Sequence, residues 1–404
     1  MPVEGGRVAI VGGSIAGCAA AIALRRARCD VTIYERSSGA LRDRGFGIGL
    51  PVSLRETLVS AGYIDAEMPV HRAVERLWVV PDVYPADGTP VEGGRVAFRQ
   101  PLSTLVTNWG IVWRTLRAKL PDEIYRPDVA VQGIEPDADG ATVVTAHGER
   151  EHVDLVVGAD GYRSFVRTLV AAEPWPAYAG YVLWRGTYPQ SRLTAPMPVV
   201  FDGAGVTVCF PGGHAVFYAV PDFATGDRRL NWAVYAAAPH GARFTSPTSL
   251  PPGSVRGELA DRLDQILAGD FPPYWAKAVR LTRRRELSLQ PIYDLAVPAY
   301  TSGRLLVAGD AGALARPHTA AGVGKALEDA HYLERACREH DTWEEVLAAY
   351  DGERRPAGNA VVELGRRLGR AQVEETPPWS SMTAEDFRTW MDTTLAGRRW
   401  RRAP

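Results

Sequence analysis

The stretch Val8–Gly17, which reads VAIVGGSIAG, decides the fold of this chain. Its first four residues are apolar, which predicts a short strand buried on both faces of a parallel sheet. A glycine-rich turn follows, and Ile15–Ala27 then predicts a helix rich in alanine and leucine. Because Val31–Tyr34 predicts the next strand, a complete β-α-β unit fits within about 30 residues, as a dinucleotide-binding fold requires.

The turn contains the residue types that a pyrophosphate-binding loop needs. Gly12 permits a tight turn out of the strand, and Gly17 permits close packing of the helix on the strand. The backbone N–H groups at the start of the helix, at Ser14, Ile15 and Ala16, can bind a pyrophosphate. Ser14 replaces the middle glycine of the G-x-G-x-x-G pattern, so its hydroxyl can bond the phosphate while its Cβ narrows the approach.

An acidic residue closes the second predicted strand. Glu35 stands 18 residues after Gly17, close to the roughly 20 expected for the acid that binds the adenosine ribose. An acid at this position selects a ribose without a 2′-phosphate, as in FAD or NAD. We therefore assign Glu35 and its neighbour Arg36 to the cofactor site. The alternative is a glycine-rich turn that binds nothing.

Two later segments complete the pattern. Gly309 and Asp310 follow the apolar run Leu305–Val307, so the carboxylate of Asp310 is placed to bond sugar hydroxyls at the end of a strand. Asp160 and Gly161 follow another short apolar run between the two ends of the chain. Each aspartate has a simple alternative role as a helix cap. The order and spacing of all three segments favour an FAD site built jointly by both ends of the chain.

The segment after Asp310 leads into a long predicted helix. Pro317 and His318 precede Gly322, Val323 and Gly324, where the helix Val323–His340 begins. The positive end of that helix can stabilise negative charge on a reduced flavin ring. We treat His318, with Pro317 before it, as the leading catalytic candidate. A purely structural loop is the alternative.

The middle of the chain consists of short aromatic and β-branched runs separated by Gly, Pro and Asp, which predicts an antiparallel sheet. These runs are Tyr181–Tyr188, Val199–Asp202, Gly205–Phe210, Ala215–Val220 and Leu230–Ala237, followed by a helix over Val255–Leu267. The sheet offers substrate-binding candidates at Trp184, Arg185, Tyr218, Trp232 and Tyr235 and a catalytic candidate at His214. The aromatic residues could equally form the sheet core, and His214 follows a Gly-Gly pair, which suits a solvated loop. Trp184 and Arg185 alternate, so only one of them faces the core.

These elements predict an α/β chain with a Rossmann-type FAD-binding domain, an inserted antiparallel β-sheet substrate domain and C-terminal helices. We expect the FAD-binding domain to comprise residues 1–75, 95–175 and 288–340. The β-rich substrate domain is expected at 76–94 and 176–287, and the C-terminal helical segment at 341–404. Trp343–Tyr350 and Asn359–Val373 are the helices expected there.

The composition excludes several functions. The formal net charge of −1 gives no attraction toward nucleic acid or an acidic membrane. No apolar stretch approaches the roughly 20 residues that span a bilayer, and the N-terminus does not resemble a signal peptide. The four cysteines are scattered without metal-type pairs, so we expect free thiols, no metal site and a cytoplasmic location. The oligomeric state is left open, with a homodimer as one alternative.

The chain resembles the class A FAD-dependent aromatic monooxygenases of the p-hydroxybenzoate hydroxylase fold, and within them the 2,6-dihydroxypyridine 3-monooxygenase type. The segments that carry the resemblance are Val11–Gly17, Tyr178–Gly186, Gly309–Ala311 and Arg316–Gly322, and it covers roughly residues 5–370. There are two departures. The chain has Ala320–Gly324 where much of the family has Gly-Gln-Gly-x-Asn, and it lacks an arginine at the start of the helix predicted over Trp109–Leu120.

The resemblance implies a monooxygenase that uses FAD, NAD(P)H and O₂ to hydroxylate an electron-rich aromatic or heteroaromatic ring through a flavin C4a-hydroperoxide. By the same resemblance, Gly12–Gly17 and Glu35 hold the ADP half of FAD, Asp310 holds the ribityl chain, and Pro317–Gly324 lie along the flavin ring. Asp160 and Gly161 correspond to a segment that handles both FAD and the nicotinamide cofactor.

Two alternatives stay open at this point. One keeps the flavin and changes the reaction to the epoxidation or Baeyer–Villiger oxidation of a natural product. The other is a binding protein that retains the flavin fold without oxidising its ligand. The nearly intact set of cofactor motifs argues against the second alternative.

Overall fold

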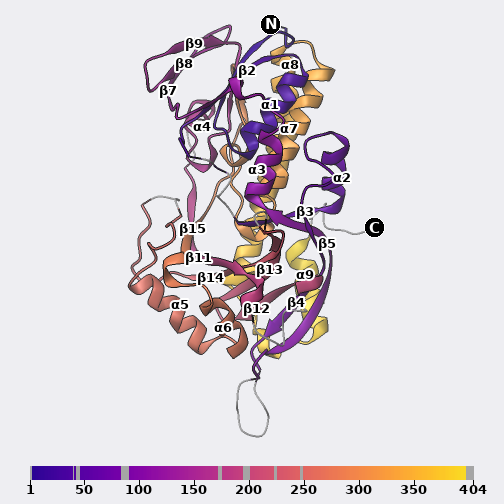
Figure 1. Cartoon of the computed structure of the whole chain (residues 1–404), viewed down its shortest axis with the longest axis vertical. Helices are drawn as coiled ribbons and strands as arrows, with labels where there is room; N and C mark the ends of the chain where they lie inside the picture. The colour runs from indigo at the N-terminus through magenta and orange to yellow at the C-terminus, as the bar shows by residue number, and fades with distance from the viewer. Residues whose placement is uncertain are drawn as a thin grey trace. The chain divides into compact units, whose positions relative to one another are not determined.

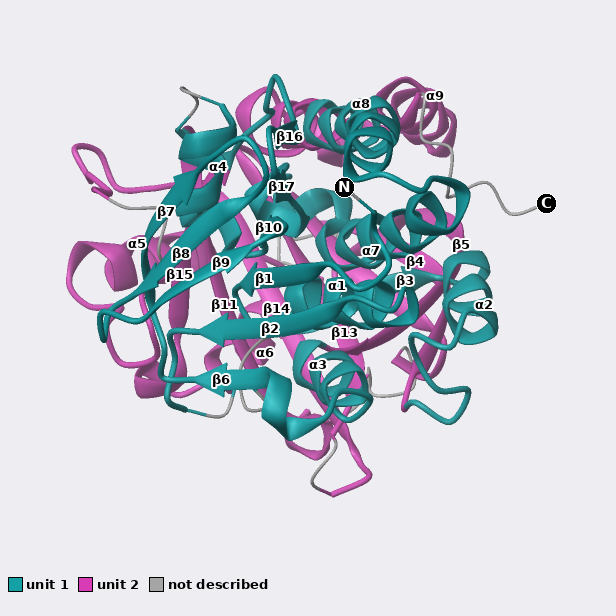
Figure 2. Ribbon diagram, turned by 90° about the horizontal axis from the view of Figure 1, so that it is seen from above, with its two compact units in different colours: residues 1–68, 109–177, 294–363 teal, residues 69–108, 178–293, 364–404 magenta. Residues whose placement is uncertain are grey.

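The computed structural model describes residues 2–39, 41, 46–82, 91–171, 175–193, 201–222, 225–245 and 249–396. The chain forms two compact units, which Figure 2 colours separately. Unit 1 comprises residues 1–68, 109–177 and 294–363, and unit 2 comprises residues 69–108, 178–293 and 364–404. Each unit is therefore assembled from three separate stretches of sequence.

Unit 1 is built on a mainly parallel sheet. Its strands follow the order β16-β17-β10-β1-β2-β6, and only β16 is antiparallel to its neighbour. The strands are β1 (Arg7–Val11), β2 (Asp30–Glu35), β6 (Tyr125–Pro127), β10 (Leu155–Gly158), β16 (Thr301–Ser302) and β17 (Leu305–Val307). Val11 lies opposite Gly158, and Gly158 lies opposite Val307. Because parallel strands end at the same edge, the turns after β1, β10 and β17 all begin there (Figure 2).

Helices and a small second sheet complete unit 1. Helix α1 packs against α3 and α7. It also contacts β1 and β2 and covers one face of these two strands. The helices are α1 (Ile15–Arg26), α2 (Val52–Ser60), α3 (Trp109–Arg117), α4 (Phe165–Val170), α7 (Gly322–Glu339) and α8 (Trp343–Gly369), the last continuing into unit 2. The remaining strands are β3 (Gly47–Pro51) and the antiparallel trio β7 (Val131–Pro136), β8 (Ala141–Thr145) and β9 (Arg150–Val153).

Unit 2 is built on a larger, mostly antiparallel sheet. Its strands follow the order β15-β11-β14-β13-β12-β4-β5, with β12 and β4 parallel to each other. They are β4 (His71–Val80), β5 (Arg95–Asn108), β11 (Ala177–Pro189), β12 (Ala204–Phe210), β13 (Gly213–Pro221), β14 (Arg228–Ala237) and β15 (Ser288–Asp294). Helices α5 (Glu258–Gly269) and α6 (Pro273–Arg280) cover one face of this sheet (Figure 1). Short 3-10 turns occur at η2 (Asp122–Ile124), η3 (Gly161–Arg163), η4 (Gln190–Arg192), η6 (Arg284–Glu286), η7 (Gly309–Ala311) and η8 (Pro317–Thr319).

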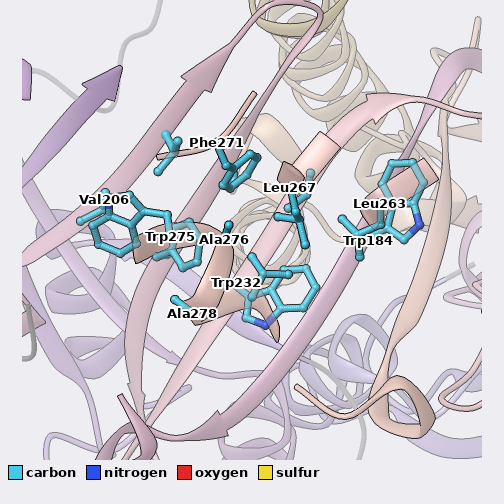
Figure 3. Packing of buried hydrophobic residues seen from close by; sticks show 14 of the residues in the cluster. Trp184, Val206, Trp232, Leu263, Leu267, Phe271, Trp275, Ala276 and Ala278 are labelled. Carbon is cyan, nitrogen blue, oxygen red and sulfur yellow. The ribbon is translucent and has the colours of Figure 1, made fainter. Parts of the chain in front are cut away.

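The core of unit 2 lies between the sheet and α5 and α6. Figure 3 shows Trp184 from the sheet beside Leu263 of α5, and Trp232 from the sheet near Leu267 of α5 and Ala276 of α6. Burying aromatic side chains of this size is the main apolar contribution to the stability of such a domain. The indole N–H of Trp232 is also hydrogen-bonded, because Nε1 donates to Thr282 Oγ1 at 2.7 Å.

The observed elements differ from the sequence expectations at identifiable places. Arg95–Asn108 was expected in the FAD-binding domain, but it forms β5 and pairs with β4, so it belongs to unit 2. The helix expected to break after Tyr350 continues through Pro356, as a single α8. The expected strand Val199–Asp202 lies partly outside the described residues, and its described end is a 3-10 turn.

The C-terminal stretch of the described chain docks on unit 2. A π-helical turn (η9, Arg370–Glu374) and a 3-10 turn (η10, Trp379–Ser381) lead into α9 (Ala384–Leu395). Phe387 is fully buried, and its ring centroid lies 6.1 Å from that of Trp78 on β4 and 5.7 Å from that of Trp379. Thr383 caps α9 through a reciprocal bond with Asp386. None of the described helices is long and apolar enough to cross a membrane.

Phe387→Ala should remove the centre of this aromatic cluster and lower the free energy of unfolding by about 3–5 kcal/mol. Guanidinium unfolding followed by tryptophan fluorescence measures the change. Phe165→Ala is the control, because Phe165 is 38% exposed and its truncation should change the unfolding free energy by less than about 1 kcal/mol. Equal effects of the two substitutions would show that α9 is not docked.

Candidate active site

The turn after β1 accepts only glycine at two positions. Gly12 has a φ of +106°, and a Cβ there would lie 2.4 Å from the carbonyl oxygen of Ala159. A Cβ on Gly17 would lie 1.8 Å from the carbonyl oxygen of Gly12, which is a severe overlap. The two glycines therefore let β1, the first turn of α1 and the segment after β10 approach each other closely.

The N-terminus of α1 is suited to binding an anion. Ser14 is the N-cap residue, yet its side chain makes no capping hydrogen bond in the described structure. The first turn, which includes Ile15, Ala16 and Gly17, also contains no acidic residue. Backbone N–H groups and the positive end of the helix dipole are therefore available to a phosphate.

Glu35 shapes this turn from the end of β2. Its carboxylate accepts hydrogen bonds from the backbone N–H of Gly13 at 2.8 Å and of Ser37 at 2.8 Å. The carbonyl of Gly13 is held as well, by Trp113 Nε1 at 2.9 Å and by the hydroxyl of Tyr125 at 3.2 Å. The backbone N–H and the backbone carbonyl of Gly13 are thus both held by side chains. Sequence reasoning assigned Glu35 but missed the aromatic pair. The neighbouring Arg36 is exposed.

The turn after β17 is clamped by a buried ion pair. Gly309 has a φ of +61°, and its N–H donates to Asp329 Oδ2 at 3.0 Å. Lys325 Nζ donates to the carbonyl of Gly309 at 2.8 Å and to Asp329 at 2.8 Å. On the far side, Arg354 Nε donates to Asp329 Oδ1 at 2.8 Å. The i, i+4 spacing of Lys325 and Asp329 on α7 is the only sequence signal for this clamp.

The charges in this region affect one another. Burial alone would raise the pKa of Asp329, but Lys325 and Arg354 hold it below its ordinary value. Burial raises the pKa of Asp310, and the positive charge of Lys325 opposes that rise. Asp310 Oδ1 lies 3.8 Å from the position of a Cβ on Gly322, so its carboxylate faces the start of α7. Lys325 therefore holds the turn at Gly309 through a hydrogen bond, and its positive charge also favours the ionised form of Asp310.

The two halves of the predicted site are neighbours within unit 1. A Cβ on Gly309 would lie 2.7 Å from the Cβ of Ala16, so the turn after β17 packs directly on the first turn of α1. The intervening sequence of nearly three hundred residues is bridged by this contact. The two segments expected to form one cofactor site therefore lie next to each other.

The loop between β17 and α7 is anchored at its start. Arg316 Nε donates to the carboxylate of Asp294 at 2.7 Å, and both side chains are buried. Pro317 and His318 follow in η8, where His318 is half-buried. Like α1, α7 begins without a side-chain cap and without an acid in its first turn, which covers Gly322, Val323 and Gly324. The backbone contacts predicted there are therefore geometrically available.

Asp160 makes hydrogen bonds at the start of α4, as one of its two expected roles requires. Its Oδ2 accepts the backbone N–H of Phe165 at 2.7 Å and of Val166 at 3.3 Å, so it caps α4. Gly161 has a φ of +76° and opens η3. Arg167 on α4 is buried and donates to the carbonyls of Tyr162 at 2.9 Å and Ala311 at 3.3 Å. This arginine joins the segment after β10 to the segment after β17.

The structure corrects two of the predicted substrate contacts in unit 2. Trp184 and Trp232 are 0% and 1% exposed and belong to the core beneath α5 and α6. Their indoles are engaged there, since Trp184 Nε1 donates to the carbonyl of Leu259 at 2.8 Å. The alternation of side chains along β11 places Arg185 on the opposite face, as the sequence pattern required.

The opposite face of the sheet carries the polar candidates. Tyr218 is half-buried and Tyr235 is buried, and the ring of His214 stacks on that of Tyr235 with centroids 4.6 Å apart. His214 is 2% exposed, so the alternative of a solvated loop histidine is wrong. Its Nδ1 lies 3.3 Å from the carbonyl oxygen of Gln372. Burial, opposed by the bond to Gln372 and assisted by the positive charge of Arg76, lowers the pKa of His214 to about 3.

An open recess of about 620 Å³ lies along α3 in unit 1. It is lined by Trp113, Arg114, Arg117, Ala118, Leu120, Pro121 and Asp122. None of the predicted site residues lines it, although Trp113 joins it to the phosphate turn through Gly13.

The fold and the site together define an FAD-dependent oxidoreductase. A parallel sheet ends at two turns where only glycine fits, beside two uncapped helix N-termini and the carboxylates of Glu35 and Asp310. Uncapped N–H groups match a pyrophosphate, and carboxylates at strand ends match sugar hydroxyls. The residues present therefore fit FAD.

Comparison with known proteins shows which proteins the chain is similar to. Residues 260–364 match a model described as FAD binding domain, residues 178–286 match FAD binding domain-like, and residues 10–40 match NAD(P)-binding Rossmann-like domain. The 2,6-dihydroxypyridine 3-monooxygenase of Paenarthrobacter nicotinovorans is 26% identical over 90% of both chains. The 6-hydroxynicotinate 3-monooxygenase of Pseudomonas fluorescens is 26% identical over 92% of this chain and 94% of its own length.

Solved structures show the same fold. The 2,6-dihydroxypyridine-3-hydroxylase of Arthrobacter nicotinovorans superposes with a TM-score of 0.81 at 24% identity, covering 93% of this chain and 95% of that one. A salicylate hydroxylase substrate complex gives a TM-score of 0.75 at 19% identity, covering 97% and 95% of the two chains. In these comparisons the chain is similar to class A FAD-dependent aromatic monooxygenases, as its motifs indicated.

Asp310→Ala should lose most of the bound FAD while the fold stays cooperative, because the sugar hydroxyls lose their acceptor. Lys325→Met should raise the dissociation constant of FAD by at least about tenfold, because the Gly309 turn loses its clamp. Fluorescence titration of the apoprotein with FAD measures both, and circular dichroism monitors the fold.

The matched control is Lys277→Met, because Lys277 lies on the surface with its side chain 68% exposed. This variant should bind FAD like the unaltered protein. Wild-type affinity in Asp310→Ala would contradict the assignment of Asp310, and wild-type affinity in Lys325→Met would contradict the clamp.

The buried His214 should make the protein sensitive to acid. Its pKa falls from 6.5 to about 3 on folding, so between these values the unfolded chain binds the additional proton. Unfolding free energy should therefore be unaffected above pH 6.5 and fall by roughly 1 kcal/mol for each pH unit below it. His214→Phe keeps an aromatic ring without the titration, and its stability should decline less steeply between pH 6 and pH 4. Identical slopes in urea unfolding would show that His214 is not buried in its neutral form.

Proposed function

We propose that this protein hydroxylates a small aromatic or heteroaromatic ring that already carries an electron-donating hydroxyl, using FAD, NAD(P)H and O₂. The observation that carries the proposal is the sheet of unit 2, where one face forms the core and the other bears His214, Tyr218 and Tyr235. The two relatives described above are named for monooxygenation of hydroxylated nitrogen heterocycles. A face of aromatic hydroxyls and a neutral imidazole suits a ring of that type.

In this proposal, the residues of unit 1 hold the cofactor. The N–H groups from Ser14 to Gly17 bind the pyrophosphate, Glu35 binds the adenosine ribose, and Asp310 binds the ribityl hydroxyls. The N-terminus of α7, at Gly322, stabilises negative charge on the ring system. FAD, reduced by NAD(P)H, supplies the activation of O₂.

The residues of unit 2 orient the substrate. The carbonyl of Gln372 can only accept, so we place the proton of His214 on Nδ1 and use Nε2 as an acceptor for a ring hydroxyl. Because its pKa is depressed to about 3, His214 orients that hydroxyl without taking its proton. The hydroxyls of Tyr218 and Tyr235 act as further hydrogen-bonding groups beside the ring. The protein thereby contributes orientation and exclusion of water, which limits the wasteful release of peroxide.

We also propose that the protein is located in the cytoplasm. Cys18, Cys29, Cys209 and Cys337 are all free thiols, which fits the reducing cytoplasm. A homodimer is one assembly to be tested by light scattering. We expect no nucleic acid partner, because the net charge is −1.

The purified holoenzyme should consume O₂ and NAD(P)H faster when given 2,6-dihydroxypyridine, 6-hydroxynicotinate or salicylate, and at least one ring should gain a single hydroxyl. Oxygen uptake, peroxide formation and mass spectrometry of the product measure this outcome. Comparing NADH with NADPH identifies the reductant. An epoxide or a ring-expanded ester as the product would replace hydroxylation by one of the alternative reactions, and no stimulation by any ring would contradict the proposal.

His318→Ala tests the loop before α7. We expect the variant to keep its FAD but to release a larger fraction of the consumed O₂ as peroxide, by several-fold, because the loop then orders the ring less well. His240→Ala is the control, since His240 is an exposed residue of unit 2. Unchanged coupling in His318→Ala would reduce His318 to a structural role.

A further inference from the structure

Helix α8 supports the backbone that leads into the turn after β17. The part of this helix that belongs to unit 1, residues 343–363, lies beside α7 (Figure 2). The hydroxyl of Tyr350 donates to the carbonyl of Val307, the last residue of β17, at 3.3 Å. Further along the helix, Asn359 Nδ2 donates to the carbonyl of Val297 at 2.9 Å. The helix therefore holds the chain on the way to the turn at two points.

Arg354 of α8 reaches the turn itself through a single carboxylate. Its side chain is only 9% exposed, and its Nε donates to Asp329 Oδ1 at 2.8 Å. Asp329 is fully buried, and its other oxygen, Oδ2, accepts the backbone N–H of Gly309 at 3.0 Å and Lys325 Nζ at 2.8 Å. One carboxylate oxygen is thus held by α8 and the other holds the turn, so Arg354 fixes the rotation of the carboxylate.

The charges around Asp329 depend on one another. The titratable groups that interact electrostatically with it are Lys325 and Glu328 of α7, Asp310 of η7, Arg354 and Tyr350 of α8, and Tyr300. Burial raises the pKa of Tyr300 to about 12 and the pKa of Tyr350 well above its ordinary value, so both hydroxyls stay neutral. Burial also acts to raise the pKa of Asp329, but Lys325 and Arg354 hold it below its ordinary value.

Loss of the charge on Arg354 would favour the protonated form of Asp329. Among the described residues, Lys325 would then be the one cation paired with this carboxylate. A buried carboxylate that is short of positive charge takes up a proton more readily. The neutral carboxyl would attract Lys325 less strongly and would be a weaker acceptor for the N–H of Gly309.

We propose that Arg354 is a positioning residue of the cofactor site, which fixes the orientation and the charge of Asp329 and thereby holds the Gly309 turn in the shape that presents Asp310 to FAD. This role rests on the proposed function, in which Asp310 binds the ribityl hydroxyls. Arg354 acts through Asp329 and not on the cofactor itself. It was not expected as a site residue, because its partner lies 25 residues away in the sequence on another helix.

Three substitutions separate the charge of Arg354 from its hydrogen bond. Arg354→Met removes both, Arg354→Gln keeps a donor without the charge, and Arg354→Lys keeps the charge. Fluorescence titration of each apoprotein with FAD at pH 6, 7 and 8 measures the dissociation constant. At pH 7 we expect Arg354→Met to raise this constant by at least about tenfold and Arg354→Gln to raise it by a smaller factor. Arg354→Lys should restore most of the affinity, because the charge returns without the planar fork.

The pH profile distinguishes this role from a merely structural one. FAD binds best when Asp310 and Asp329 are both ionised, so binding weakens as either of them takes up a proton. Without the charge of Arg354 the pKa of Asp329 is higher. The dissociation constants of Arg354→Met and Arg354→Gln should therefore rise more steeply from pH 8 to pH 6 than that of the wild type, whereas Arg354→Lys should follow the wild-type profile. A loss of packing alone would weaken binding by the same factor at every pH.

A double-mutant cycle tests the connection between the two residues. If Arg354 acts through Asp329, Arg354→Met should not weaken FAD binding further in a chain that already carries Asp329→Asn. Arg335→Met is the matched control, because Arg335 is an arginine of α7 whose side chain is 55% exposed and whose ion pair with Glu339 lies on the surface. This variant should bind FAD like the wild type.

Wild-type affinity and a wild-type pH profile in Arg354→Met would overturn the proposal, as would an equal weakening by all three substitutions that does not depend on pH. Further weakening in the Asp329→Asn chain would overturn the route through Asp329. If circular dichroism shows that Arg354→Met does not fold, Arg354→Gln and Arg354→Lys decide, and identical pH profiles of these two variants would overturn the proposal. Wild-type affinity in Asp310→Ala together with weak binding in Arg354→Met would overturn only the assignment of Asp310 in the proposed function.

Discussion

The packing of the turn after β17 on the first turn of α1 is the contact on which the site of unit 1 depends. At Gly309 a side chain is excluded by Ala16, and the left-handed turn is held by Lys325 and Asp329. The pairing of β1, β10 and β17 brings the turn that supplies Asp310 to the same edge as the phosphate turn, and this contact then fixes how the two turns pack. A buried ion pair is a weak source of net stability, but it is an effective way to impose one backbone geometry.

Unit 2 applies a simpler constraint, the alternation of side chains along a strand. One face is apolar and is covered by α5 and α6, whereas the other carries guanidinium, hydroxyl and imidazole groups. Since the period of a strand is two, a shift of register by one residue would exchange the two faces. The tryptophan core beneath the helices therefore also fixes which side of the sheet presents Arg185.

The two kinds of constraint differ in how well the sequence reveals them. Glycines, uncapped helix starts and Glu35 belong to local patterns of fixed spacing, so the cofactor half of the molecule could be predicted. The sequence does not decide whether Trp184 and Trp232 contact the substrate or form the core. A strand pattern shows that side chains alternate, but it does not show which face the helices cover. Arg76, Trp113 and Lys325 act through partners distant in sequence. Strand β5 escaped prediction because its long run mixes arginine, serine and threonine with the apolar residues.

The peptide of Gly13 has an additional consequence for the assembly of the holoenzyme. Its N–H is occupied by Glu35, and its carbonyl by Trp113 and Tyr125, all of them groups of the protein itself. These bonds hold the loop in this shape through groups of the protein alone. Little backbone entropy is then lost on association, so more of the intrinsic interaction energy remains as affinity. In this respect the phosphate turn is a preorganised binding site.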